Sequence, residues 1–111
     1  MKDKITIAID AMGGENSPKK NIHGLSIFLK KNKNLKNCFF KLYGNEKLIN
    51  QKMKKYNISS SNIKIYDTLS VVSDEETPIT AVKNSKNSSM WNTINSQIID
   101  DSDISLSAGN T

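Results

Sequence analysis

Hydrophobic and polar positions follow two alternating periods along the chain, which predicts strands and helices in turn. Residues 4–10 place isoleucines on one side and the small Thr6 and Ala8 on the other, as in a strand that is covered on both faces. A glycine pair then permits a tight turn. Apolar side chains at helical spacing predict a helix over residues 18–31.

The same order of strand, turn and helix recurs along the rest of the chain. Further strands are predicted at residues 38–43, 62–66 and 103–107, and further helices at residues 46–56 and around residues 90–98. Strands that alternate with helices of this length form βαβ units, so the predicted fold class is α/β. We expect an open, mainly parallel, Rossmann-like sheet with helices on both faces, which is a three-layer αβα arrangement.

The chain stops where a turn from strand to helix should begin. Most domains end on an element that is packed in place, whereas residues 108–111 form a loop of small polar residues after the fourth strand. We therefore interpret residues 1–111 as the amino-terminal part of a single α/β catalytic domain whose remainder is missing.

Three segments carry candidate chemistry, and the first follows the first strand at the sheet edge where α/β proteins bind ligands. The glycines of residues 10–15 let the backbone approach a ligand, and the next helix offers free N–H groups to an anion. Ser17 is the predicted N-cap, with Pro18 as the first helical residue. Asp10 would repel a phosphate, so we expect it to fix the turn by accepting hydrogen bonds from loop N–H groups. An ordinary tight turn is the alternative.

The second segment is the loop at residues 107–111. Ser107, Asn110 and Thr111 are neutral hydrogen-bond donors, and Gly109 leaves its backbone open. Such donors stabilise an oxyanion without titrating, although a plain Ser/Asn/Gly turn would have the same composition. The chain lacks both the P-loop pattern and the G-x-G-x-x-G pattern, which disfavours those two nucleotide-binding classes.

The third segment covers residues 76–90. Pro78 is suited to open a short helix, and the Ser88-Ser89 pair is suited to cap the next one. Lys83 and Lys86 are three residues apart and would form a positive patch on one helix face. A purely structural role for this segment is the alternative.

The net charge of +5 raises the question of nucleic-acid binding, but the distribution of charge argues against it. Of the 16 basic residues, 14 lysines lie in residues 1–64 beside 4 acidic residues, whereas residues 65–111 hold 2 lysines and 7 acidic residues. The chain has no arginine, the residue that base and phosphate recognition most often uses. Most of the lysines are therefore interpreted as solvated positions on helices and loops.

Other candidate chemistry is sparse. Cys38 is the single cysteine, so we expect a buried thiol and no disulfide within the chain. His23 has no acidic or cysteine partner nearby in sequence and is interpreted as an ordinary surface or core histidine, and no metal-ligand spacing occurs. No apolar run approaches a membrane span and no signal peptide is present, which predicts a cytoplasmic protein.

Taken together and in this order, the three segments resemble those of the bacterial phosphate acyltransferases of phospholipid synthesis, the acyl-carrier-protein:phosphate acyltransferases. The similar stretches are residues 7–14 (IAIDAMGG), residues 76–90 (E-x-P-x-x-A-V-K-x-x-K-x-S-S-M) and residues 107–111 (SAGNT). The chain departs from the family at Glu15, where Asp is favoured, at Lys83, where Arg is favoured, and at Ser85, where a second basic residue is common. The resemblance spans residues 5–111 and about the first third of a typical member.

The resemblance implies a reaction in which inorganic phosphate attacks the thioester of an acyl carrier protein to give an acyl phosphate and free carrier. Phosphate is itself the nucleophile, so the enzyme works by positioning and fixed dipoles, and no metal or organic cofactor is implied. The resemblance also implies a homodimer when intact, a link to a membrane acyltransferase that uses acyl phosphate, and peripheral association at the inner face of the membrane. Nucleic acid is not an expected partner.

Within this hypothesis each segment has a role. The expected catalytic positions are Asp10, Ser107, Asn110 and Thr111, and the expected substrate contacts are Met12, Gly13, Gly14, Lys83, Lys86, Ser88, Ser89 and Gly109. The two lysines would meet either the acidic carrier protein or phosphate. We expect the 111-residue chain to have no turnover by itself.

Three other functions stay open at this point. A phosphotransacetylase-like enzyme would use coenzyme A in place of the carrier protein. A non-catalytic remnant would bind the carrier without cleaving its thioester. A basic nucleic-acid-binding domain would show a steep dependence of DNA affinity on salt.

Overall fold

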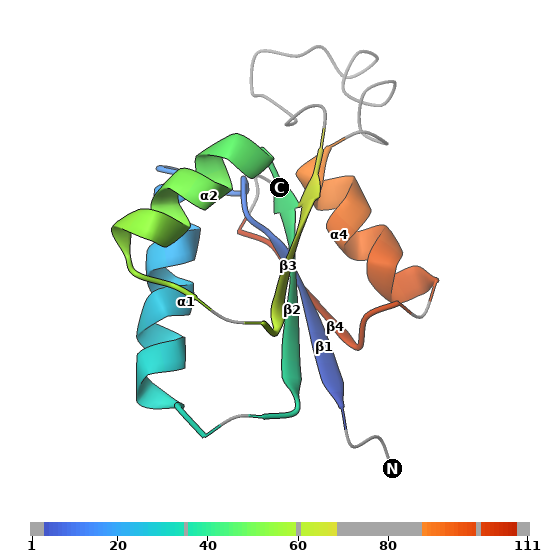
Figure 1. The fold of residues 1–111 in the computed structure, drawn as a ribbon. Coiled ribbons are helices and arrows are strands. Elements are labelled where there is room, and N and C mark those ends of the chain that lie inside the picture. Colours follow the sequence, from blue (N-terminus) through green and yellow to red (C-terminus); the bar gives the residue numbers. More distant parts are fainter. Residues whose placement is uncertain (1–3, 35, 60, 69–87, 100, 109–111) are drawn as a thin grey trace.

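A four-stranded parallel sheet forms the centre of the structure. The computed structural model of the chain describes residues 4–34, 36–59, 61–68, 88–99 and 101–108. In chain order the described elements are β1 (Ile5–Asp10), α1 (Lys19–Lys31), β2 (Cys38–Gly44), α2 (Glu46–Lys55), β3 (Ile63–Asp67), α4 (Ser89–Ile98) and β4 (Ile104–Leu106), as Figure 1 shows. The elements predicted at these places are confirmed, and their ends differ from the expected ones by one residue.

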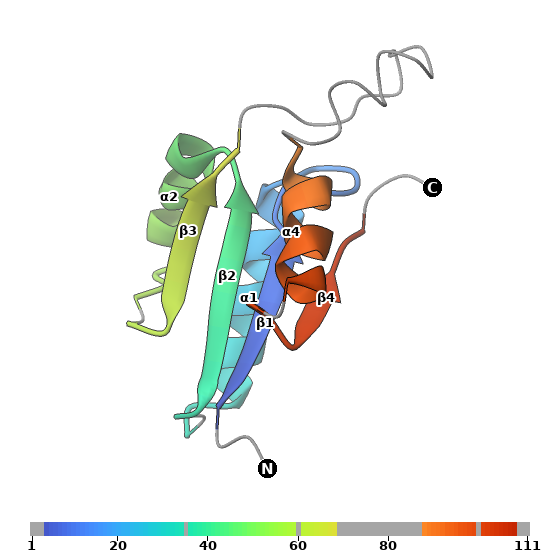
Figure 2. The same ribbon diagram turned by 90° about the vertical axis from the view of Figure 1, so that its right-hand side faces the viewer.

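The strand order is β3-β2-β1-β4, and every neighbouring pair is parallel. Ile9 of β1 lies opposite Leu42 of β2 on one side and opposite Leu106 of β4 on the other. All four carboxyl ends therefore meet at one edge of the sheet, where the arrowheads point in Figure 2. The predicted α/β fold class with a parallel Rossmann-like sheet is confirmed.

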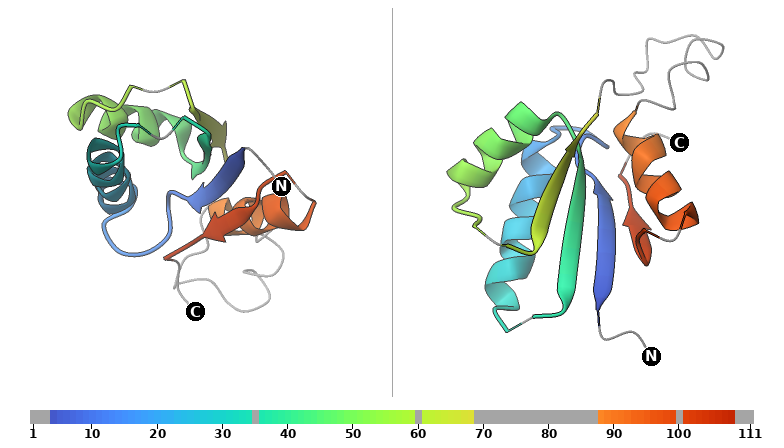
Figure 3. Two further views of the ribbon diagram at one scale, coloured as in Figure 1. Left: turned by 90° about the horizontal axis from the view of Figure 1, so that it is seen from below. Right: turned by 45° about the vertical axis from the view of Figure 1, so that its right-hand side comes forward.

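Helices cover both faces of the sheet. Figures 1 and 3 show α1 and α2 on one face and α4 on the other. The main hydrophobic core lies under α1 and α2 and consists of Ala11, Ile22, Leu25, Phe40, Leu42 and Ile49. Burying an aliphatic side chain of this size contributes roughly 1.5–3 kcal/mol, so this layer supplies most of the apolar stabilisation in the described residues.

The face under α4 is built from small and hydroxyl side chains. Ala8 of β1 is fully buried there, and α4 buries Ser89, Thr93 and Ser96. The Thr93 hydroxyl is buried, but it keeps a hydrogen-bond partner because it donates to the carbonyl of Ser89 at 2.7 Å. The apolar residues of α4 point outward instead, and Ile98 is 74% exposed. No helix in the described part of the chain is both long and apolar enough to cross a membrane.

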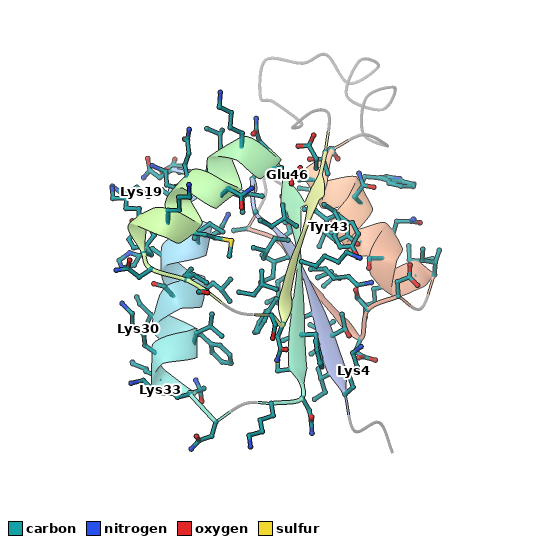
Figure 4. The ribbon with its side chains drawn as sticks, viewed as in Figure 1. Lys4, Lys19, Lys30, Lys33, Tyr43 and Glu46 are labelled. Carbon is teal, nitrogen blue, oxygen red and sulfur yellow. The ribbon has the colours of Figure 1, made fainter. Side chains whose placement is uncertain are left out.

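The structure tests the expectations of a buried Cys38 and of solvated lysines, and the first is met only in part. Cys38 is half-buried, and burial raises the pKa of its thiol, which favours the unreactive protonated form. The lysines of the α1 region are exposed, and Figure 4 shows Lys19, Lys30 and Lys33 pointing away from the sheet. Solvated lysines are therefore the correct interpretation of this part of the charge.

Burial also raises the pKa of the Tyr43 hydroxyl above its ordinary value of 10.0, and the nearby Tyr66 and Asp101 act in the same direction against a hydrogen bond with Ser96. Above pH 10 the unfolded chain binds fewer protons than the folded chain, so the free energy of unfolding should fall as pH rises. Urea denaturation on either side of this pH tests the expectation. The variant Tyr43→Phe should lose less stability in alkali than the wild type, and an equal loss in both proteins would contradict the assignment.

Candidate active site

One buried carboxylate joins three distant parts of the chain at the carboxyl edge of the sheet. Asp10, the last residue of β1, is 2% exposed. Its Oδ1 accepts hydrogen bonds from the Met12 N–H at 3.1 Å and from the Ser89 hydroxyl at 2.5 Å. Its Oδ2 accepts the Ser107 hydroxyl at 2.7 Å. The expected bond from a loop N–H to Asp10 is confirmed, and each of the three sequence segments has at least one residue at this carboxylate or beside it.

The loop at residues 11–17, here called the glycine loop, also contacts the segment that follows β4. Gly14 has a φ of +83°, and a Cβ built on it would lie 2.9 Å from the carbonyl oxygen of Ala108. A side chain at this position therefore has no room, whatever its chemistry. The first and fourth strands thus place their following loops in contact, as a shared pocket requires.

The entry to α1 differs from the prediction. The Ser17 hydroxyl donates to the carbonyls of Gly13 at 2.5 Å and Gly14 at 2.8 Å, so it does not cap the helix. Pro18 is the N-cap, it follows a cis peptide bond, and it makes no side-chain cap bond. The expectation that Ser17 caps a helix beginning at Pro18 is wrong, because the hydroxyl is used to hold the glycine loop.

Asn21 is a loop-organising residue that the sequence did not single out. Its Nδ2 donates to the carbonyls of Ala11 at 2.8 Å and Gly13 at 2.9 Å from the first turn of α1. These bonds direct the loop carbonyls toward the helix. Three loop N–H groups are already used: that of Ala11 donates to the carbonyl of Tyr43 at 2.9 Å, that of Met12 donates to Asp10 Oδ1, and that of Gly13 makes a long bond to the carbonyl of Asp10 at 3.4 Å. The N–H of Gly14 is then directed to other partners.

The start of α4 faces the same carboxylate. Ser88 caps the helix as predicted, and its Oγ accepts the N–H of Trp91 at 3.0 Å. Ser88 and Ser89 are each 1% exposed. The positive end of the helix dipole therefore lies at Asp10, where it stabilises the negative charge of the carboxylate.

The strand order places this cluster at a topological switch point. From β1 the chain moves to β2 and β3 on one side, and it then crosses to β4 on the other side. In open α/β sheets the ligand crevice lies at such a reversal, outside the carboxyl ends of the two strands that flank it. Asp10 is the last residue of β1, and Ser107 directly follows β4. This position could not be deduced from sequence, because strand order depends on contacts between distant residues.

The remaining expected site residues fall into two groups. The side chain of Met12 lies against the end of β2, because a Cβ built on Gly44 would be 2.7 Å from the Met12 Cγ. Met12 therefore contributes its backbone N–H, and not its side chain, to the cluster at Asp10. Gly109, Asn110 and Thr111 lie outside the described residues, as do Lys83 and Lys86. Among the described residues there is no group of three or more His, Cys, Asp or Glu side chains that could hold a metal ion.

Comparison with known proteins decides the family. A model of the family described as "Fatty acid synthesis protein" matches residues 5–111. The chain belongs to this family. Its relatives include the phosphate acyltransferase of Pelagibacter ubique, which is 39% identical over 111 residues, covering 100% of the chain and 32% of the relative.

Two further relatives of the family carry the same name. The phosphate acyltransferase of Pediococcus pentosaceus is 37% identical over 105 residues, which is 95% of the chain and 28% of the relative. That of Lactobacillus johnsonii is 38% identical over 106 residues, which is 96% of the chain and 30% of the relative. The resemblance found in the three sequence segments is therefore confirmed, and the chain spans about a third of the length of these relatives.

Proposed function

We propose that the protein is a phosphate acyltransferase that converts acyl-[acyl-carrier-protein] and inorganic phosphate to acyl phosphate for phospholipid synthesis. Residues 1–111 would form the amino-terminal part of its catalytic domain. Membership of the family supports this proposal, and the observation that carries it is the convergence of three segments on Asp10 at the switch point. No metal or organic cofactor takes part in the proposed reaction.

In the proposed reaction a phosphate oxygen attacks the thioester carbonyl carbon, and the C–O bond forms as the C–S bond breaks. The electron pair leaves with sulfur as the carrier thiolate, which takes up the proton that hydrogen phosphate releases and becomes the free thiol. The loop N–H groups near Gly13 and Gly14 and the helix start that follows would hold the phosphate. Asn110 and Thr111 would donate to phosphate or to the developing oxyanion, which neutral donors stabilise without titrating.

The structure changes the role that we assign to Ser107. A hydroxyl has one proton, and that of Ser107 is donated to Asp10. The same holds for Ser89. We therefore assign both serines to positioning: they fix the end of β4 and the start of α4 on Asp10. Lys83 and Lys86 keep their proposed role toward the carrier protein or phosphate.

The decisive experiment measures acyl phosphate formation by the full-length enzyme. Acyl carrier thioesters and coenzyme A thioesters of the same chain length are supplied with and without inorganic phosphate. We expect acyl phosphate and free carrier thiol in equal amounts, only with phosphate present and faster with the carrier protein. Faster turnover of the coenzyme A thioester would point to a phosphotransacetylase-like enzyme, and carrier binding without cleavage would point to a non-catalytic module.

We further propose that the intact protein is a cytoplasmic homodimer that associates peripherally with the inner face of the membrane, where a membrane acyltransferase uses the acyl phosphate. The exposed apolar side chains of α4, such as Trp91 and Ile94, support a contact with another surface. Light scattering after gel filtration tests the dimer, and a mass of one chain would contradict it. Flotation with anionic vesicles tests the membrane contact.

A further inference from the structure

An apolar groove runs along α1 on the face of the sheet that carries the main core. Its volume is about 540 Å³, within the range of roughly 300–1,000 Å³ that small-molecule sites occupy. The apolar wall consists of Ile7, Ile9, Leu25, Phe28, Phe40 and Leu106. Phe28 is 41% exposed and Leu106 is 52% exposed, so the apolar surface in this groove is open to an occupant.

The groove and the candidate active site share one end. Asp10, Ser107 and Ala108 line the groove, and the first two are joined by the 2.7 Å hydrogen bond at the switch point. Ala108 is also the residue that packs against Gly14. A molecule that reaches from the glycine loop along α1 therefore passes from polar to apolar surroundings without interruption.

At Gly24 the α1 side of the groove carries no side chain. Gly24 lies inside a helix, where glycine is less favourable than alanine, and it lines the groove. A Cβ built on it would meet nothing within 4 Å, so no described part of the protein requires a glycine there. The missing side chain leaves space for an occupant of the groove.

The right-handedness of βαβ connections determines which helices can cover the face of the sheet that carries the groove. Right-handed connections put α1 and α2 on one face and α4 on the other, because the chain moves in opposite directions across the sheet. A helix leading from β4 to a strand beyond it on the same edge would lie on the α4 face. Such a crossover helix would leave the groove open.

We propose that this groove binds the acyl chain of the thioester substrate. The proposal rests on the proposed function and assigns the apolar part of its substrate a place. The thioester carbonyl would lie near Asp10 and Ser107, and the hydrocarbon would run along Gly24 toward Phe28. Each buried methylene should then raise the affinity about fourfold, which is about 0.8 kcal/mol.

The test adds side chains at Gly24 in the full-length enzyme and compares octanoyl with palmitoyl carrier thioesters. With Gly24→Leu and Gly24→Phe we expect kcat/KM for palmitoyl to fall about tenfold or more relative to octanoyl, because the bulk occupies the path of the longer chain. The control is Lys31→Phe, which adds the same ring at the exposed end of α1, outside the groove. It should keep the wild-type ratio.

The ratio of the two substrates separates this proposal from a loss of folding, which would lower both rates equally. An unchanged ratio in Gly24→Phe, or an equal loss for both chain lengths, would show that the groove holds another part of the protein and would overturn the proposal. A wild-type enzyme that forms no acyl phosphate from either thioester would instead contradict the proposed function.

Discussion

Replacing Asp10 with asparagine in the full-length enzyme is expected to lower kcat/KM for the proposed acyl phosphate formation about 100-fold and to destabilise the protein. Asparagine keeps the shape but lacks the charge, and its amide nitrogen cannot accept a hydrogen bond from a serine hydroxyl. Either Ser89 or Ser107 then loses its acceptor, and a hydrogen bond to a charged group contributes about 1.5–3 kcal/mol. A shift of about 1 Å in the loops that we propose to position the two substrates is enough for a rate loss of this size.

Asp103→Asn is the matched control for this experiment. The Asp103 Oδ2 accepts the N–H of Thr6 at 2.9 Å, so this carboxylate also joins two strands, but at the opposite edge of the sheet. We expect a loss of thermal stability without a selective loss of kcat/KM. An Asp10→Asn enzyme with full activity and an unchanged melting temperature would show that the carboxylate does not organise the site.

A double-mutant cycle can locate the coupling within the site. Ser89→Ala and Ser107→Ala each remove one hydroxyl from Asp10, and the remaining serine can still hold its own segment. Because both act through the same carboxylate, their combined effect on activity should differ from the sum of the single effects. Additive losses would indicate that the two serines act at separate places.

The parts of the fold that the sequence predicts are those that depend on local period. Alternation in β1 separates Ile7 and Ile9, which pack on the core, from Ala8 and Asp10, which face α4. The helix predicted at residues 46–56 likewise begins where expected, because the Asn45 side chain accepts a hydrogen bond from the N–H of Leu48 at 3.1 Å. These patterns suffice because each depends on a few neighbouring residues.

The face that α4 buries was harder to predict. Its apolar positions indicate a helix, yet the buried stripe is Ser89, Thr93 and Ser96. The reason lies in the face of the sheet that α4 covers. There, Ala8 and the carboxylate of Asp10 favour small side chains with hydroxyl donors over large apolar ones. Hydroxyl residues spaced four and three apart on one helix are the signal that could have revealed this face.

Asn21 and the switch point show two further limits. The chain is rich in asparagine, so a single asparagine near a glycine loop carries little information until its amide is seen to bridge loop carbonyls. The place of β4 beside β1 is a contact between residues about a hundred positions apart, such as Ile7 and Ile104. Sequence period cannot report such a contact, whereas the motifs at the strand ends could suggest that their loops meet.

Replacing Gly14 with alanine is expected to cause the second large loss. A φ of +83° is unfavourable for a residue with a side chain, at a cost of about 1–2 kcal/mol. The new Cβ would also lie 2.9 Å from the Ala108 carbonyl oxygen, which is backbone and cannot move without moving the end of β4. Thermal unfolding should show a lower melting temperature, and kcat/KM should fall about 100-fold because the two loops separate.

Asn57→Ala separates the backbone strain from the effect on the site. Asn57 also has a positive φ, 55°, but it follows α2 at the edge of the sheet away from Asp10. Alanine there should lower stability by about 1 kcal/mol and leave kcat/KM unchanged. If Gly14→Ala and Asn57→Ala lose stability alike but only the former loses activity, the contact between Gly14 and Ala108 is required for the reaction. Equal activity in both variants would mean that the loops need not touch, and the proposed shared phosphate site would then be wrong.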